Sequence, residues 1–230
     1  MAGKFKRLFE NDKIYHIYNR GARKLDIFFN DANRQRFVDL LTWHQQLSYP
    51  YSLYLKRLDE QRHSSPTDLK IKLRQLYGTL HPPIEIFAYV LMPNHFHIVI
   101  KQKIPRGISK FMIEVLIGYS LYFNRKNNNS GSVFQGRFKS KEISDLEQLH
   151  LVIRYIHQNP LKANMIIQGK TLENYKWSSY YEYLNTGILT KEKVINPDYI
   201  LGNYENLNNF IAYTKETTEE PLSDKITIDK

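Results

Sequence analysis

The sequence predicts an α+β domain built on an antiparallel sheet with helices on one face. Two observations support this prediction: short runs of β-branched and aromatic residues, and stretches with helical spacing that recur between those runs. The chain has 230 residues, a length typical of one domain with appendages. Because 42% of its residues are hydrophobic, it can bury a core.

The first strand is predicted at residues 13–19, where aromatic and β-branched residues precede a glycine. A helix follows, with Asp31 as its expected N-cap. Four residues at helical spacing mark its buried face, namely Phe37, Leu40, Leu41 and His44. Residues 48–83 lose this pattern, so we expect an insertion there, with a short helix at 69–76.

The centre of the sequence predicts a hairpin and a long helix. Residues 84–92 are an almost continuous apolar run, typical of a central strand. Pro93 and Asn94 then turn the chain into a second strand at 95–101. Apolar residues recur every third or fourth position from 108 to 122, which indicates an amphipathic helix.

A further strand is predicted at residues 132–143, where side chains alternate in polarity. Asp145 is the expected cap of the next helix, which should run to about residue 158 and stop before Pro160. The predicted order is therefore βαββαβ, a ferredoxin-like arrangement, followed by a C-terminal helix that carries Tyr155.

We divide the chain into a basic arm (1–10), a main domain (11–185, with the insertion 48–83) and an extension (186–230). Residues 215–230 are polar, and we expect them to be flexible. The N-terminus has no apolar signal segment, no run is long enough to span a bilayer, and cysteine is absent. A soluble, cytoplasmic protein without disulfides is expected.

The net charge of +10 and the pI near 9.5 favour a polyanionic partner, with nucleic acid ahead of a membrane surface. The charge is concentrated: residues 101–141 contain nine lysines and arginines against one carboxylate, Glu114. A solvated basic surface is the alternative interpretation of the same charge.

Two histidines share a predicted strand. His95 and His97 point to one face because strand side chains alternate, whereas Phe96 points to the other. Two parallel imidazoles of this kind can share a divalent ion. Ordinary histidines on a half-exposed face would give the same pattern.

The predicted helix near residue 150 places Tyr155 and Asn159 on one face, since they are four residues apart. His157 lies about 200° around the helix from Tyr155 and should be packed or exposed elsewhere. Because the chain has 17 tyrosines, periodicity alone does not select Tyr155 as functional.

The strand predicted around residues 133–141 carries a polar and basic stripe, made of Gln135, Arg137, Lys139 and Lys141. Such a stripe suits contacts with phosphate. A solvated sheet face is the equally simple alternative.

Four segments, with a later Trp177-Ser178-Ser179-Tyr180, resemble the REP-associated tyrosine transposases of the HUH single-tyrosine superfamily. Their order and spacing agree from about residue 11 to residue 184. The combination of MPNHFH with RYIHQNP is specific. The segments are IYHIYNRGARKLDIFF (14–29), AYVLMPNHFHIVI (88–100), VFQGRFKS (133–140) and RYIHQNPLKA (154–163).

The resemblance implies roles for matching residues. His95 and His97 correspond to the pair that binds Mg²⁺ or Mn²⁺, and Tyr155 corresponds to the nucleophile. Related insertion-sequence transposases complete the metal site with a glutamine where this chain has Asn159. Asn159 is therefore either the third metal ligand or a cap at the helix end before Pro160.

The expected function is metal-dependent nicking and strand transfer on single-stranded or hairpin, REP-like DNA, through a 5′-phosphotyrosine. A monomer is favoured over a homodimer, and no membrane is involved. The alternatives are a hairpin-binding protein that does not cleave, and a metal-dependent phosphohydrolase that uses water. The expected DNA contacts are Arg20, Lys101, Lys103, Arg106, Gln135, Arg137, Lys139 and Lys141.

Overall fold

The computed structural model describes residues 9–60, 65–79, 82–166, 171–185 and 193–216. Most of the expected N-terminal arm (1–8) and most of the expected flexible tail (217–230) lie outside the described residues. Among the described helices, none combines the length and the apolar character that crossing a membrane requires.

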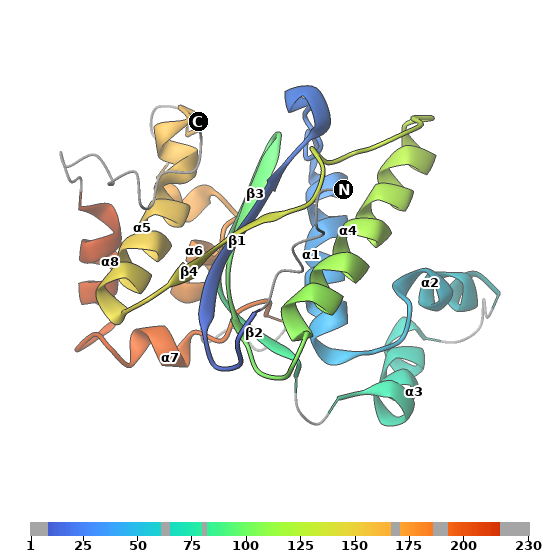
Figure 1. The fold of residues 1–230 in the computed structure, drawn as a ribbon, viewed down its shortest axis with the longest axis horizontal. Coiled ribbons are helices and arrows are strands. Elements are labelled where there is room, and N and C mark those ends of the chain that lie inside the picture. Colours follow the sequence, from blue (N-terminus) through green and yellow to red (C-terminus); the bar gives the residue numbers. More distant parts are fainter. Residues whose placement is uncertain (1–8, 61–64, 80–81, 167–170, 186–192, 217–230) are drawn as a thin grey trace, which may run out of the picture.

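Four antiparallel strands form the central sheet. They are β1 (Ile14–Arg20), β2 (Ile84–Met92), β3 (His95–Gln102) and β4 (Lys139–Ile143), in the spatial order β2-β3-β1-β4. Every strand pair is antiparallel. With helices between β1 and β2 and a helix between β3 and β4, this order confirms the predicted ferredoxin-like βαββαβ arrangement (Figure 1).

Two long helices, α1 (Asp31–Gln46) and α4 (Gly107–Lys126), cover one face of the sheet (Figure 1). The four residues predicted to mark the buried side of α1 are all buried. The ring of Phe37 lies 5.0 Å from that of Phe96, so helix and sheet share one aromatic core. The N-cap of α1 is Asn30, whose side chain accepts from the Asn33 amide, and not Asp31 as predicted.

The opposite face is covered by α5 (Leu146–Lys162) (Figure 1). Asp145 caps α5 as predicted, since its side chain accepts from the Gln148 amide at 2.7 Å. The predicted stop before Pro160 is wrong, because α5 continues to Lys162 with Pro160 in its last turn. Proline removes one intrahelical hydrogen bond there, and the helix accommodates this close to its end.

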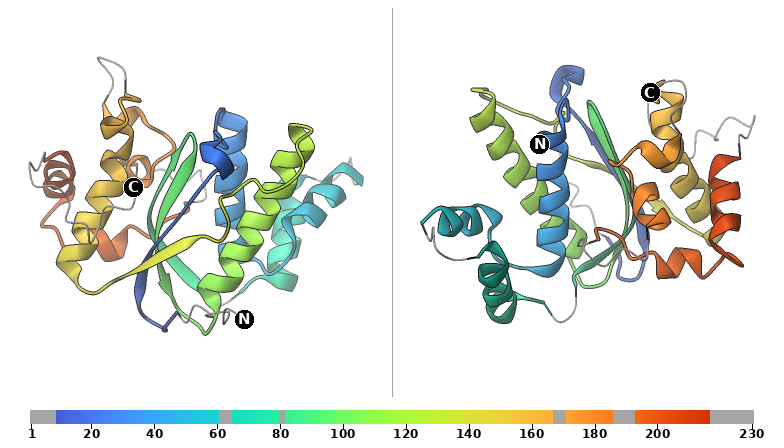
Figure 2. Two further views of the ribbon diagram at one scale, coloured as in Figure 1. Left: turned by 45° about the horizontal axis from the view of Figure 1, so that its top comes forward. Right: turned by 180° about the vertical axis from the view of Figure 1, so that it is seen from behind.

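The described C-terminal segment includes α6 (Ser179–Leu184), α7 (Asp198–Leu201) and α8 (Leu207–Lys215), on the same side of the sheet as α5 (Figure 2). Helices α6 and α7 contact β2, and α8 packs against α5. Phe210 of α8 is buried in the main core. The described part of the expected extension therefore contributes to the folded body.

The 48–83 insertion forms α2 (Tyr51–Glu60) and α3 (Pro66–Tyr77) beside α1, on the side of the sheet away from α5 (Figure 1). The predicted helix at 69–76 corresponds to α3, whereas α2 was not predicted. The insertion has a small core of its own with α1, composed of Trp43, Leu47, Tyr49, Tyr54, Leu69 and Leu73.

The strand predicted at 132–143 is shorter than expected, because β4 begins at Lys139. Gly136 has a φ of 73°, in the left-handed region that favours glycine, and this breaks the alternation. Val133 and Phe134 are both buried, whereas Gln135 and Arg137 are exposed on a loop. The predicted four-residue stripe therefore divides into a loop and a strand.

Candidate active site

The pairing of β1 with β3 brings polar residues onto the face covered by α5. Tyr18 lies opposite His97, and Arg20 lies opposite His95. Directly paired residues of antiparallel strands share a face, so these four side chains form one group. The turn before His95 is held in place by Gly21, whose amide donates to the Asn94 carbonyl at 2.7 Å.

His95 and His97 lie close together, with ring centres 5.1 Å apart and ring planes perpendicular. The Nδ1 atom of His95 is 2.6 Å from the Asn94 side-chain oxygen, which orients this ring. His97 is fully buried, and burial, followed by the nearby His16 and His95, holds its pKa well below the usual range. The buried ring is therefore neutral at pH 7, the form that binds metals.

A third histidine, which the sequence did not single out, contacts this pair. His16 of β1 is buried, and its Nε2 atom lies 2.9 Å from the Nδ1 atom of His97. Burial, with a smaller contribution from Lys141, lowers the pKa of His16 to about 3. The ring of Tyr18 lies 5.4 Å from that of His16 and 6.0 Å from that of His97.

Tyr155 of α5 faces the histidines from above the sheet. Its ring centre is 5.7 Å from that of His97, in an edge-on arrangement. Only 5% of Tyr155 is exposed. The ammonium of Lys162 lies 5.3 Å from the centre of the Tyr155 ring, so a cation accompanies the tyrosine. The structure thus brings Tyr155, His95 and His97 together within a single chain.

Helix α5 is tied to its surroundings on its far side. His157 was predicted to be either packed or exposed away from Tyr155, and it is buried. Its Nε2 atom lies 2.8 Å from the Ser179 hydroxyl. Arg154 forms an ion pair of 3.1 Å with Glu216, and Gln158 donates to the Thr214 carbonyl at 2.9 Å. These contacts join α5 to α6 and to the end of α8, and they fix the height of Tyr155 over the sheet.

Asn159 stays within α5, one turn after Tyr155. It is buried, and its Nδ2 atom donates to the Tyr155 carbonyl oxygen at 3.2 Å. The amide nitrogen is therefore directed back along its own helix, and the side-chain oxygen is the atom that remains to act as a ligand.

Five of the predicted DNA contacts lie near the histidines. Lys139 is opposite Tyr18 and Lys141 is opposite His16, so both lie on the histidine face. The loop before β4 is held against the end of β1, because the Gln135 amide donates to the Arg20 carbonyl at 2.7 Å. Arg137 is exposed on this loop. The Nε atom of Arg20 is buried and has no hydrogen-bond partner among the described residues.

The other three predicted contacts lie at the opposite end of the sheet. Lys101 is six residues along β3 from His95, a separation of about 20 Å. It pairs with Asp12 at 3.5 Å, and Lys103 pairs with Glu85 at 3.6 Å. Arg106 precedes α4 in a left-handed conformation. The basic stretch 101–141 is thus divided between two ends of the molecule.

The donor set near Tyr155 fits a divalent ion only in part. The imidazoles of His95 and His97 and the Asn159 oxygen are the available protein donors. Within the described part of the chain, no group of three or more His, Cys, Asp or Glu side chains is arranged to hold a metal. An ion held here needs further oxygen ligands from water or from DNA phosphate.

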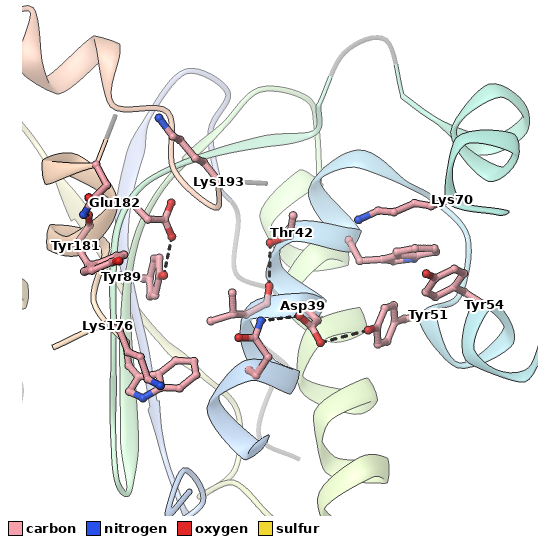
Figure 3. Close-up of a pocket in the computed structure, with 15 residues that line it drawn as sticks. Asp39, Thr42, Tyr51, Tyr54, Lys70, Tyr89, Lys176, Tyr181, Glu182 and Lys193 are labelled. Atoms are coloured by element: carbon pink, nitrogen blue, oxygen red, sulfur yellow. Dashed lines mark hydrogen bonds between the residues drawn. The ribbon is translucent and has the colours of Figure 1, made fainter. Parts of the chain in front are cut away.

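A separate cavity of about 480 Å³ lies at the β2 edge, between α1, the insertion and α6. Figure 3 shows the hydrogen bond from the Tyr89 hydroxyl to Glu182 on one side of the cavity and that from the Tyr51 hydroxyl to Asp39 on the other. The first measures 2.6 Å and the second 3.3 Å. The predicted site residues are not among the described residues that line this cavity.

Comparisons with known proteins agree with the geometry. Residues 68–159, less than half of the chain, match the family described as "Transposase IS200 like". The resemblance to the tyrosine transposases is confirmed. The IS200-like segment contains β2, β3, α4, β4 and α5 as far as Asn159. It therefore includes His95, His97 and Tyr155, whereas β1 with His16 and Arg20 precedes it.

A solved structure described as "Structure of the REP associates tyrosine transposase bound to a REP hairpin" is similar in fold, with a TM-score of 0.52. The similarity covers 85% of this chain and 93% of that one, at 14% sequence identity. This likeness supports the α+β fold of the chain. No curated protein sequence matches the chain.

Three residues near this site escaped the sequence analysis: His16, Tyr18 and Lys162. His16 and Tyr18 share the strand parity of Arg20, which was predicted to contact DNA. Alternation along β1 places these residues on one face, but it identifies them as site residues only once the partner strand and its register are known. Lys162 was missed because the helix was expected to stop before Pro160.

Proposed function

We propose that this protein is a metal-dependent enzyme that nicks and rejoins single-stranded or hairpin DNA through Tyr155. The observation that supports this proposal most directly is the edge-on contact between Tyr155 and His97, 5.7 Å between ring centres. A tyrosine on α5 facing two imidazoles on β3 supplies the groups that such a reaction requires.

In the proposed reaction, the Tyr155 phenol oxygen attacks a DNA phosphorus atom. A phosphorus–oxygen bond to tyrosine forms as the bond to the 3′ oxygen breaks, and the phenol proton is lost as the 3′ oxygen gains one. The product is a 5′-phosphotyrosine with a free 3′-hydroxyl. Because the bond energy is conserved, attack by a 3′-hydroxyl reverses the step and joins strands without ATP.

The chain's own residues prepare this step. The Lys162 ammonium, 5.3 Å from the Tyr155 ring centre, places a positive charge beside the proposed nucleophile, where negative charge develops during the reaction. The buried Nε of Arg20, beside His95, is suited to donate to a phosphate oxygen. His95, His97 and Asn159 would hold Mg²⁺ or Mn²⁺, which when bound stabilises charge on the phosphate oxygens.

We further propose that DNA lies on the histidine face of the sheet, over the part formed by β1 and β4. Lys139 and Lys141 would contact phosphates, and the exposed Gln135–Arg137 loop would contact the strand beside them. Tyr18, with the Lys139 ammonium 5.8 Å from its ring centre, is placed to stack on a base. Lys101, Lys103 and Arg106 would then contribute to general attraction of DNA.

The test uses a pool of single-stranded hairpins with randomised flanks, labelled at the 3′ end and incubated with Mn²⁺. Denaturing gels should show a labelled protein–DNA adduct with the wild type and none with Tyr155→Phe, while Tyr18→Phe still forms one. An adduct that persists in Tyr155→Phe would exclude Tyr155 as the nucleophile. Binding without an adduct would support a hairpin-binding protein, and cleavage without one would support a phosphohydrolase.

A further inference from the structure

We propose that His16 is a positioning residue that holds His97 in the tautomer able to bind a metal ion. The inference rests on the metal site of the proposed function and adds a residue outside the matched family segment. It starts from the 2.9 Å contact between the His16 Nε2 atom and the His97 Nδ1 atom.

Both rings lie inside the protein, with 1% of His16 and 0% of His97 exposed. Protonating either ring at such a site would leave a charge away from water, so both are neutral. A hydrogen bond between two neutral imidazoles needs one N–H donor and one bare nitrogen acceptor. The pair therefore has two arrangements, which differ in the ring that donates.

Only one arrangement suits metal binding. If the His97 Nδ1–H donates to His16, the Nε2 atom of His97 carries a lone pair and can bind an ion. If His16 donates instead, the single proton of His97 lies on Nε2 and blocks it. The partner of Nδ1 thus determines whether His97 is a ligand, as hydrogen-bond partners of ligating histidines generally do.

The neighbouring side chains keep the His16 ring in this position. The ring of Tyr18 lies 5.4 Å from that of His16, and the two histidine rings are 5.0 Å apart and tilted by 32°. Carboxylates, carbonyls and water are the usual partners of a ligating histidine. A neutral imidazole that accepts the His97 Nδ1–H selects the metal-binding tautomer without adding negative charge where an anionic phosphodiester must bind.

The experiment measures Mn²⁺ affinity by calorimetry without DNA and the His97 tautomer by ¹⁵N NMR of the metal-free protein. In the wild type the proton of His97 should lie on Nδ1. His16→Phe, which keeps a ring but removes the acceptor, should shift that proton to Nε2 and weaken Mn²⁺ binding by about 10- to 100-fold. His16→Gln, which restores an acceptor, should recover most of the affinity.

His150→Phe is the matched control, because His150 contacts Tyr204 on the far side of α5 and not the histidine pair. It should leave Mn²⁺ affinity unchanged. An Nε2–H tautomer in the wild type, or wild-type affinity in His16→Phe, would overturn the role of His16. If His95→Ala loses Mn²⁺ binding while His16→Phe binds Mn²⁺ as the wild type does, the proposed metal site stands and only the role of His16 is excluded. If His16→Phe does not fold, the His97 tautomer in the wild type and the Mn²⁺ affinity of His16→Gln still test the role of His16.

Discussion

The two faces of the sheet are built from the same strands but differ in almost every chemical respect. On the α1 and α4 face, Ile17, Phe96 and Ile98 are completely buried among apolar side chains. On the α5 face, His95 and His97 lie among tyrosines and lysines. Because strand side chains alternate, a step of one residue separates a core position from a site position. Stability and chemistry should therefore be separable by mutating neighbours in the sequence.

The largest expected effect compares Phe96 with His95. Phe96→Ala removes a ring packed against Phe37 and Phe134 and should lower the free energy of unfolding by about 3–5 kcal/mol. His95→Ala changes a partly exposed residue on the other face and should cost less than about 1 kcal/mol while abolishing adduct formation. Urea denaturation measures the free energy of unfolding of both variants, and denaturing gels measure adduct formation. Similar losses of stability in both variants would contradict the division between faces.

A pH effect is expected on the α5 side through His157. Burial lowers its pKa to about 3, whereas an unfolded histidine titrates near 6.5. Below pH 6.5 the unfolded state binds a proton that the folded state does not, so stability falls with acidification. The loss should reach roughly 2 kcal/mol between pH 7 and pH 5. His157→Gln should show a shallower decline in denaturation series over this range, and an unchanged slope would refute the assignment.

Asn159 tests whether the α5 face needs a third protein ligand. If its side-chain oxygen binds the ion, Asn159→Ala should weaken Mn²⁺ binding by roughly tenfold. Asn159→Asp should strengthen it, because a carboxylate is a better oxygen ligand. Calorimetry with Mn²⁺ measures both changes. A lowered melting temperature with unchanged Mn²⁺ affinity would instead assign Asn159 to the helix alone.

The smallest effect concerns DNA affinity at the two ends of the sheet. For single strands, log K falls with log salt by about 0.7 for each phosphate neutralised. Lys139→Gln should reduce that slope by about 0.7, because Lys139 lies on the histidine face. Lys103→Gln is the comparison variant and should change the slope less, since Lys103 pairs with Glu85 at the other end and would attract DNA without a defined phosphate contact. Equal changes in the two variants, in fluorescence titrations over a salt series, would place DNA elsewhere.

The sequence predicts the framework of this protein well where one pattern dominates. Alternation in the histidine strand and helical spacing in α1 and α4 survive in the structure because burial on one face requires them. The motifs around His95 and Tyr155 identified these residues through resemblance. Periodicity alone did not distinguish Tyr155 from the other tyrosines.

The remaining features depend on contacts that local patterns do not encode. His16 reaches His97 only through the register of β1 on β3, which pairs residues about 80 positions apart. The strand before Lys139 was overestimated because the positive φ of Gly136 is set by the loop and not by side-chain alternation. The ordered α8 helix was missed because the site that buries Phe210 is formed by other segments of the chain.

The short link from β4 to α5, residues Ser144 and Asp145, has a consequence for kinetics. In the structure, α5 lies on its own sheet and Tyr155 is beside the histidines of the same chain. If Tyr155 attacks DNA as proposed, assembling its reactive groups does not require a second copy. The rate per molecule on saturating DNA would then be independent of dilution, and mixing Tyr155→Phe with His97→Ala would restore no adduct.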